Sequence, residues 1–258
     1  MFTFAVHSAC VARPMSNPTA ASTAKIASLL SAAGGSCSRG TTAEKLHWWG
    51  KGIDDSDCAA LAEALAGSKE KAKLKNLLLG SNSIGDACVG ALAATAGKGA
   101  LGELRSIGLS RNRITDLGCE SFATAWASHM DKLRALYISK NQVGDRCALA
   151  LATALGQRPN LTSLSIVDNA LTGAGLKGLL EALRPGHALR EIAVSNNSIC
   201  SPPDSLGAAL ESAAAAGLQR LVVKVAGRAC AKHDDRDGAM RSWQALQQRV
   251  PQVRLVYR

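Results

Sequence analysis

Hydrophobic and polar positions follow one motif that recurs along the chain, Leu-x-x-Leu/Ile-x-Leu/Ile/Val-x-x-Asn-x-Leu/Ile/Val. The motif occurs five times, and its asparagines are 28 to 30 residues apart. A fixed period of this length indicates stacked structural units, because one unit of this size cannot bury its own apolar face. The five asparagines are Asn82, Asn112, Asn141, Asn169 and Asn197.

Each copy predicts a short strand, a turn and a helix. Hydrophobic residues two positions apart, such as Leu77 and Leu79, place both side chains on one face of a strand. The asparagine that follows can both donate and accept hydrogen bonds, so we expect a ladder of asparagines that satisfies backbone groups of neighbouring turns. Aspartate is a preferred residue at the start of a helix, and we expect helix N-caps at Asp86, Asp116 and Asp145.

These residues closely resemble the leucine-rich repeats of the ribonuclease-inhibitor class, which also occur in NOD-like receptors and in Ran GTPase-activating proteins. The resemblance runs from about Leu46 to Val225. It implies an α/β fold, a curved leucine-rich-repeat solenoid with a parallel β-sheet on the concave face and helices on the convex face. It does not fix a function, because one scaffold can serve many partners.

Three regions are expected along the chain. Residues 44–225 would form the solenoid, with five clear repeats and degenerate ends, and residues 226–258 a basic C-terminal cap. Residues 1–43 hold no acidic residue and are rich in Ser, Thr and Ala, a composition typical of removable organelle targeting peptides. The helical spacing of Ile26, Leu29 and Leu30 fits a capping helix instead. Both interpretations of this tail stay open.

The net charge of +10 is concentrated at the two ends of the chain. Residues 1–43 contribute +3, and residues 218–258 contribute +6 from nine basic and three acidic residues. The repeats between them hold 18 basic and 17 acidic residues and are nearly neutral. The charge therefore points to anionic partners at the ends more than along the solenoid body.

The eight cysteines show no Cys-x-x-Cys pair that could begin a zinc site. Four of them lie at the same place in successive repeats, and we expect these to be free, buried side chains that behave as small hydrophobes. Free thiols favour a reducing compartment, and hence the cytoplasm. The lumen of a plastid or mitochondrion is the alternative if residues 1–43 are a transit peptide. The four are Cys58, Cys88, Cys119 and Cys147.

Residues suited to catalysis or metal binding do not gather in this pattern. The five histidines occupy unrelated positions in the repeats, and paired carboxylates do not recur on the expected concave face. No apolar run approaches the ~18 residues that a membrane-spanning helix needs. We therefore expect no enzyme, no cofactor, no metal site and no transmembrane segment.

The expected concave face is small and polar except where large or charged residues project from it. Tyr137 lies at its centre and Leu78 to one side, while Lys75, Arg105, Arg134 and Arg190 enter their strands at equivalent positions. Equivalent residues of neighbouring repeats lie about 5 Å apart, so these cations would gather. The predicted contact residues are Tyr137, Leu78, Arg105, Arg111, Arg134 and Lys140.

The sequence therefore predicts a non-enzymatic scaffold, a monomer or a subunit of a complex, that binds a protein partner through this face and its adjacent loops. An acidic segment of the partner would suit the arginines. One alternative is a regulator of a small GTPase similar to Ran GTPase-activating proteins, although those carry an acidic C-terminal region where this chain is basic. The other is binding of nucleic acid or an anionic surface through Arg220, Lys224, Arg228, Lys232 and Arg236.

Overall fold

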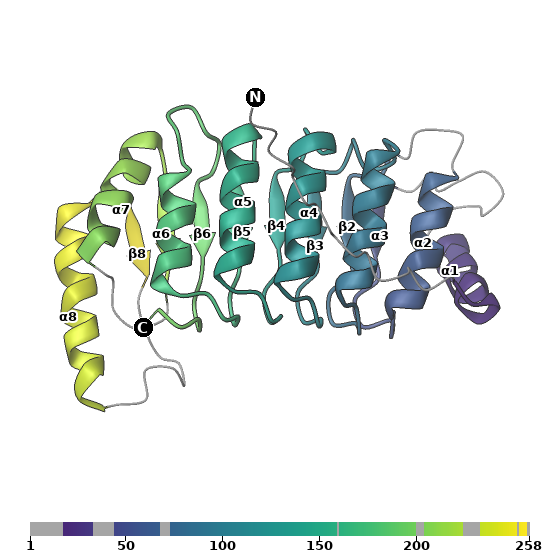
Figure 1. The fold of residues 1–258 in the computed structure, drawn as a ribbon, viewed down its shortest axis with the longest axis horizontal. Helices are drawn as coiled ribbons and strands as arrows, with labels where there is room; N and C mark the ends of the chain where they lie inside the picture. The colour runs from purple at the N-terminus through teal and green to yellow at the C-terminus, as the bar shows by residue number, and fades with distance from the viewer. Residues whose placement is uncertain are drawn as a thin grey trace, which may run out of the picture.

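The computed structural model describes residues 18–32, 44–67, 73–158, 160–199, 204–223, 233–251 and 253–256. Within these residues, eight parallel strands form one sheet in which each strand pairs with the next along the chain (Figure 1). The predicted α/β leucine-rich-repeat solenoid is confirmed. The strands are β1 (Lys45–His47), β2 (Asn76–Leu78), β3 (Ser106–Gly108), β4 (Ala135–Tyr137), β5 (Ser163–Ser165), β6 (Glu191–Ala193), β7 (Arg220–Val222) and β8 (Arg254–Val256).

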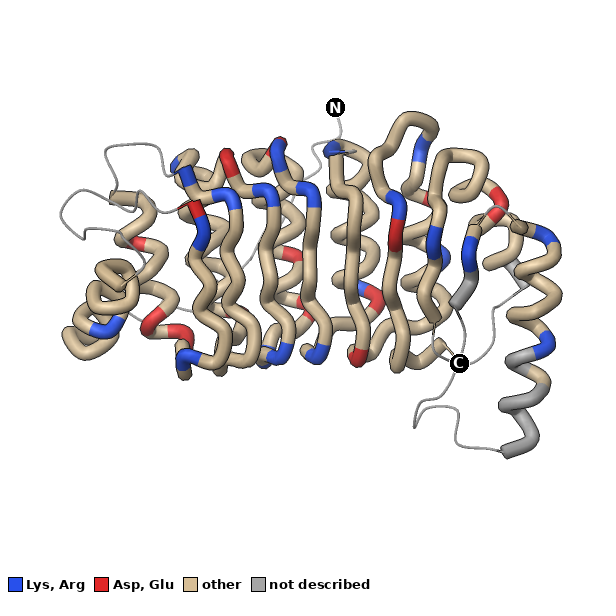
Figure 2. Tube along the Cα trace, turned by 180° about the vertical axis from the view of Figure 1, so that it is seen from behind, with Lys and Arg blue, Asp and Glu red and all other residues tan. Residues whose placement is uncertain are grey.

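Helices cover one side of the sheet and leave the other side open, as the opposite views of Figure 1 and Figure 2 show. We call this open side the sheet face. The helices are α1 (Ala20–Ala32), α2 (Asp55–Ala66), α3 (Asp86–Gly97), α4 (Asp116–His129), α5 (Asp145–Gln157), α6 (Gly173–Glu181), α7 (Asp204–Ala216) and α8 (His233–Arg249).

The core lies between the sheet and the helices. The central residue of each strand points into it, and these residues are aligned by the strand register, as in Leu77, Ile107 and Leu136. Each of these three side chains is fully buried. Burial of such a side chain contributes about 1.5–3 kcal/mol, so the repeated motif supplies most of the driving force for stacking.

Helix α1 packs against α2 at the N-terminal end of the solenoid. Its Ile26 and Leu30 are buried, and its Lys25 forms an ion pair with the buried carboxylate of Asp57. Lys25 also donates to the carbonyl of Gly52 at 2.7 Å. The rest of the predicted tail, residues 1–17 and 33–43, lies outside the described residues, as do residues 226–232, 252 and 257–258 of the predicted C-terminal cap.

The asparagines join each turn to the turn before it. Asn112 donates from Nδ2 to the carbonyl of Leu79 at 3.0 Å, and its Oδ1 accepts from the N–H of Ile84 at 3.1 Å. Both partners belong to the preceding repeat. The same amide also donates to Leu109 in its own turn at 2.9 Å. Equivalent bonds are made by Asn82, Asn141, Asn169 and Asn197.

The prediction that Asp86, Asp116 and Asp145 are the N-caps of their own helices is wrong. The N-cap positions are Gly85, Thr115 and Gly144, and each aspartate is the first residue of its helix. Its carboxylate reaches forward and caps the helix of the next repeat. Asp116 accepts from the N–H of Gly144 at 2.6 Å and from that of Cys147 at 3.1 Å. The unsatisfied N–H groups at a helix start are thus paired by a neighbour rather than locally.

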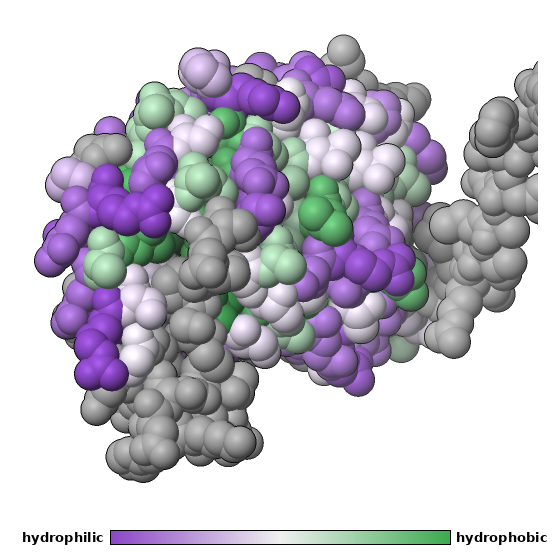
Figure 3. Space-filling model, turned by 60° about the vertical axis from the view of Figure 1, so that its left-hand side comes forward, coloured by the Kyte–Doolittle hydropathy of each residue, from purple (hydrophilic) through white to green (hydrophobic). Residues whose placement is uncertain are grey.

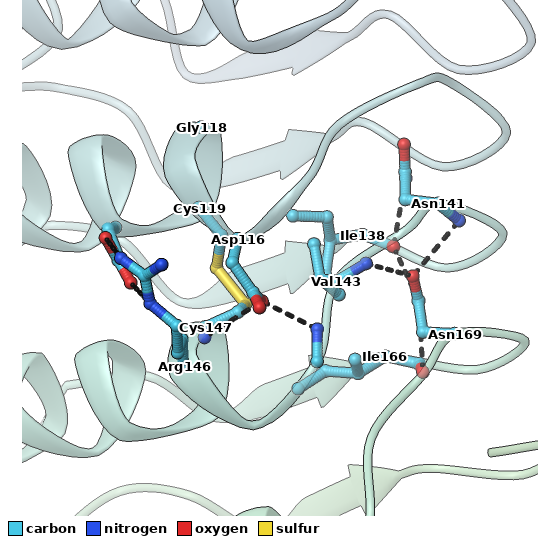
Figure 4. Close-up of a disulfide and its surroundings, with 12 residues drawn as sticks. Asp116, Gly118, Cys119, Ile138, Asn141, Val143, Arg146, Cys147, Ile166 and Asn169 are labelled. Atoms are coloured by element: carbon cyan, nitrogen blue, oxygen red, sulfur yellow. Dashed lines mark hydrogen bonds and ion pairs between the residues drawn. A yellow bond between two sulfur atoms is a disulfide. The ribbon is translucent and has the colours of Figure 1, made fainter. Parts of the chain in front are cut away.

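The prediction of free cysteines is also wrong. Cys58 is bonded to Cys88, and Cys119 to Cys147, so two disulfides join neighbouring repeats. Figure 4 shows the second of them. Their Cα atoms are 5.2 and 5.3 Å apart, within the range that a disulfide spans. Equivalent positions of stacked repeats lie at this separation, so a shared register brings the thiols together. The inference of a reducing compartment loses its basis with the free thiols.

Large hydrophobic side chains are exposed at few places in the described part of the chain. They are Trp49, Leu117, Tyr137 and Leu149. Leu117 and Leu149 lie in helices α4 and α5. In the view of Figure 3, hydrophobic residues occur in small separate areas among hydrophilic and neutral ones. Broad apolar patches are therefore absent from that view, and the two exposed aromatic residues, Trp49 and Tyr137, need a separate explanation.

Candidate functional site

The sheet face displays the first and third residue of each strand. In the third position, Leu78, Gly108 and Tyr137 are aligned across β2, β3 and β4. Tyr137 is 39% exposed. Leu78 leans over its neighbour, since a Cβ atom on Gly108 would lie 2.9 Å from Leu78 Cδ2. The structure therefore brings two of the predicted contact residues into one row, separated by a glycine.

Trp49 is an exposed aromatic residue of the sheet face that the sequence analysis did not select. Its side chain is 56% exposed. The ring covers Gly80 of the next repeat, because a Cβ atom there would lie only 2.2 Å from Trp49 Cζ3. The signal was present in the alternation of the strand, in which Leu46 and Trp48 point inward and are buried. Trp49 must then point outward.

One row of cations precedes the strands, and we call Lys75, Arg105 and Arg134 the entry row. Lys75 forms an ion pair with Glu44 at 2.6 Å. Arg134 donates only to the backbone carbonyls of Asp131 and Leu133, at 3.4 and 3.2 Å. Within the described residues, neither Arg105 nor Arg134 has an ion-pair partner. The row continues through the uncharged Thr162 to Arg190.

The positive charge of the entry row lowers the pKa values of nearby carboxylates. The hydrogen bond from Lys75 and its charge lower the pKa of Glu44, and the charge of Arg105 adds to this effect. The pKa of Glu103 is lowered in the same way, first by its hydrogen bond with Lys132 and also by the charges of Arg105 and Lys75. These shifts are consistent with an excess of positive charge at this edge.

A second row of cations follows the strands, and we call Arg111 and Lys140, each directly before a ladder asparagine, the exit row. Figure 2 shows both rows as blue segments along opposite edges of the sheet face. Arg111 and Lys140 adopt the left-handed conformation, with φ of 59° and 56°. Lys140 Nζ lies 3.8 Å from Asp168 Oδ2. Within the described residues, Arg111 has no ion-pair partner.

The left-handed conformation is a demand of the turn and not of these cations. The residue before each ladder asparagine has a positive φ, and Gly50 occupies the equivalent place in the first repeat with φ 62°. A residue other than glycine costs roughly 1–2 kcal/mol in this conformation. Glycine would therefore suit the backbone better, and the positive side chains of Arg111 and Lys140 need another reason.

The predicted contact residues do not form one cluster. Arg105 and Arg134 lie at one edge, Arg111 and Lys140 at the other, and Tyr137 and Leu78 between them. Arg105 and Arg111 are six residues apart in extended chain, which is about 20 Å at ~3.3 Å per residue. The candidate site is therefore an uncharged band bordered by positive charge on two sides.

Other chemistry is sparse in the described residues. They contain no group of three or more His, Cys, Asp or Glu side chains that could hold a metal ion. None of their helices is long and apolar enough to cross a membrane. A surface hollow of about 450 Å³ between α4 and α5 is lined mainly by Ala and Thr, with Glu120 as its one titratable side chain.

Comparisons with known proteins agree with the repeat pattern. A leucine-rich-repeat family model matches residues 104–123, 129–152 and 157–180. No curated protein matches the chain. The chain contains leucine-rich repeats over the matched residues, and its five-fold motif and parallel strands continue with the same period on both sides.

Two of the solved structures that match this chain do so at low sequence identity. The actin-binding site 2 of leiomodin-1 is 18% identical, with a TM-score of 0.44 over 62% of this chain and 87% of that one. An internalin from Listeria monocytogenes is 19% identical, with a TM-score of 0.32 over 57% of this chain and 48% of that one.

Proposed function

We propose that this protein is an interaction scaffold of the ribonuclease-inhibitor repeat class that binds a protein partner on its sheet face. The contact surface consists of Tyr137, Leu78 and Trp49, with the cations of the entry and exit rows around them. The period of 28 to 30 residues and the α-helix in each repeat support the class.

The exposed aromatic residues carry this proposal. Trp49 and Tyr137 leave a large part of their rings in solvent on a face that is otherwise small and polar. Tryptophan, tyrosine and arginine are the residues that most often dominate binding energy at protein interfaces. Leu78 extends the apolar area between them. A partner that covered these residues would remove apolar surface from water and meet positive charge at the rim.

The basic C-terminus has less support as the binding site. Arg220 forms an ion pair with Glu191 at 3.3 Å, and Arg249 with Glu211 at 2.8 Å. Lys224, Arg228 and Lys232 lie outside the described residues. No observation favours regulation of a small GTPase, so the sheet face is the surface to test first.

Affinity capture from native lysate at moderate salt tests the proposal. The test variant carries Tyr137→Ala, Arg111→Glu and Arg134→Glu, all at exposed positions of the sheet face. The matched control carries Leu117→Ala and Lys177→Glu, which remove a large exposed side chain and reverse a charge on helices α4 and α6. We expect a partner to be captured by the wild type and the control and lost by the test variant. Equal capture by all three proteins would refute the proposal.

A further inference from the structure

Among the described repeats, β3 and β4 have a cation both at the entry position, directly before the strand, and at the exit position, directly before the ladder asparagine. Arg105 and Arg111 border β3, and Arg134 and Lys140 border β4. In the repeat before them the exit position is Ser81, and in the repeat after them the two positions are Thr162 and Asp168, so the arrangement stops on both sides. The four cations mark the corners of a frame of about 5 Å by about 20 Å.

Each short side of this frame places two like charges next to each other. Arg105 lies beside Arg134, and Arg111 beside Lys140, in neighbouring strands. Like charges at directly opposite positions of a sheet destabilise it. Lys140 Nζ lies 3.8 Å from Asp168 Oδ2, whereas neither Arg105 nor Arg111 forms an ion pair within the described residues, although the charge of Arg105 acts on Glu44 and Glu103. Three of the four cations are thus held next to a like charge without an ion-pair partner of their own.

The area inside the frame is uncharged. The outward side chains of β3 and β4 and of the residues after them are small, except for Tyr137 near the middle. Ser139 Oγ is hydrogen-bonded to Ser165 Oγ at 2.8 Å, which satisfies that hydroxyl within the protein. The outward residues are Ser106, Gly108, Ser110, Ala135, Tyr137 and Ser139.

We propose that the frame binds an extended acidic segment of the partner protein, an inference that rests on the proposed function. The segment lies along the strands, places one acidic group between Arg105 and Arg134 and a second between Arg111 and Lys140, and packs an apolar side chain on Tyr137. The two acidic groups are about six residues apart, since an extended chain rises ~3.3 Å per residue. Carboxylates form charge-assisted hydrogen bonds with arginine, which suits both ends of the frame.

A nucleic acid fits this frame less well. A strand carries a phosphate at every nucleotide, so a strand that reached both ends would place phosphates over the uncharged middle. Binding of single strands also uses several aromatic side chains as stacking platforms, whereas the frame holds only Tyr137. Charge complementarity therefore favours a peptide with two acidic residues about six positions apart and an apolar residue between them.

Selection of random dodecapeptides displayed on phage, with the full chain as target, tests this inference. We expect the enriched peptides to carry two acidic positions five to seven residues apart, with an apolar or aromatic residue between them. Enrichment of peptides without this spacing would overturn the inference, and so would failure to enrich any sequence.

Two variants then test the ends of the frame with a synthetic copy of the best peptide. The exit variant Arg111→Gly/Lys140→Gly removes two charges at positions whose positive φ suits glycine, so the fold is retained. Ser81→Gly makes the same backbone change at φ 54°, one repeat earlier and without a charge. The entry variant is Arg105→Gln/Arg134→Gln, and Tyr137→Ala removes the ring between the two ends.

We expect each end variant to weaken binding about tenfold, because an exposed charge pair contributes a few-fold and each variant removes two. Ser81→Gly should bind like the wild type. If the peptide binds both end variants normally but loses binding when Tyr137 is replaced, the inference of an acidic segment is overturned and the proposed function stands. Peptides that need neither Tyr137 nor the cations would refute both. If an oligothymidylate displaces the peptide with equal affinity and no longer binds either end variant, the acidic peptide is overturned in favour of nucleic acid.

Discussion

Loss of the two disulfides should markedly destabilise the solenoid. They join Cys58 to Cys88 and Cys119 to Cys147, across 30 and 28 residues of chain. A cross-link stabilises the folded state mainly by restricting the unfolded chain, and a loop of about 30 residues gives ~3.6 kcal/mol in that model. The two loops do not overlap in sequence, so their contributions should add to about 7 kcal/mol. All four side chains are fully buried, and the reduced thiols would still fill the same space.

Urea unfolding followed by circular dichroism, with and without reductant, measures this effect. The variant Cys119→Ala/Cys147→Ala should lose about half of the stability that reductant removes from the wild type, and reductant should then remove only the other half. Peptide mapping after alkylation in denaturant should show both cross-links. Identical unfolding midpoints with and without reductant would refute the reasoning, and so would quantitative alkylation of the four thiols without reduction. Because stable disulfides form in oxidising compartments, the mapping also tests the expected cytoplasmic location.

Four further substitutions test contacts between repeats and the pH dependence of stability. Gly118→Ala should lower the free energy of unfolding by about 1–3 kcal/mol, since its Cβ atom would lie 2.4 Å from Asp86 Oδ1. The control Gly90→Ala adds a Cβ atom with nothing within 4 Å and should stabilise helix α3 by up to about 1 kcal/mol. Equal unfolding midpoints of the two variants would contradict this. Asn112→Ala leaves buried backbone groups of two repeats without partners and should cost about 2–4 kcal/mol in urea unfolding, so an unchanged midpoint would argue against the ladder. Burial, with the charge of nearby Arg190, lowers the pKa of His187 below its ordinary 6.5. As the pH falls, the unfolded chain binds the proton before the folded chain does, so the stability that His187 contributes is full above pH 6.5 and falls as the pH drops below it. His187→Gln should therefore flatten the change in unfolding midpoint between about pH 7.5 and 5.5. An unaltered slope would exclude His187 as the cause of that change.

The sequence by itself determined the repeat and the properties that depend only on its period. Alternation around Leu77 and Leu79 predicts a strand with one buried face, and the period predicts that all strands run in parallel and in register. The face that carries Leu78 and Tyr137 and the edges that carry Arg105 and Arg111 come from the same register. These properties depend on local periodicity, which the order of residues contains completely.

Only the tertiary structure decided which groups of neighbouring repeats meet. The cysteines share a register, but the bond between Cys58 and Cys88 depends on how closely two helices stack. Asp116 caps the next helix and not its own because the turn of the next repeat brings the N–H groups of Gly144 and Cys147 to 2.6 and 3.1 Å from its carboxylate. Trp49 covers Gly80 because the neighbouring repeat has no side chain there. Such contacts depend on how side chains of segments about 30 residues apart are oriented and packed, and a periodic pattern fixes the position of each residue within its repeat but not which atoms of the next repeat it meets.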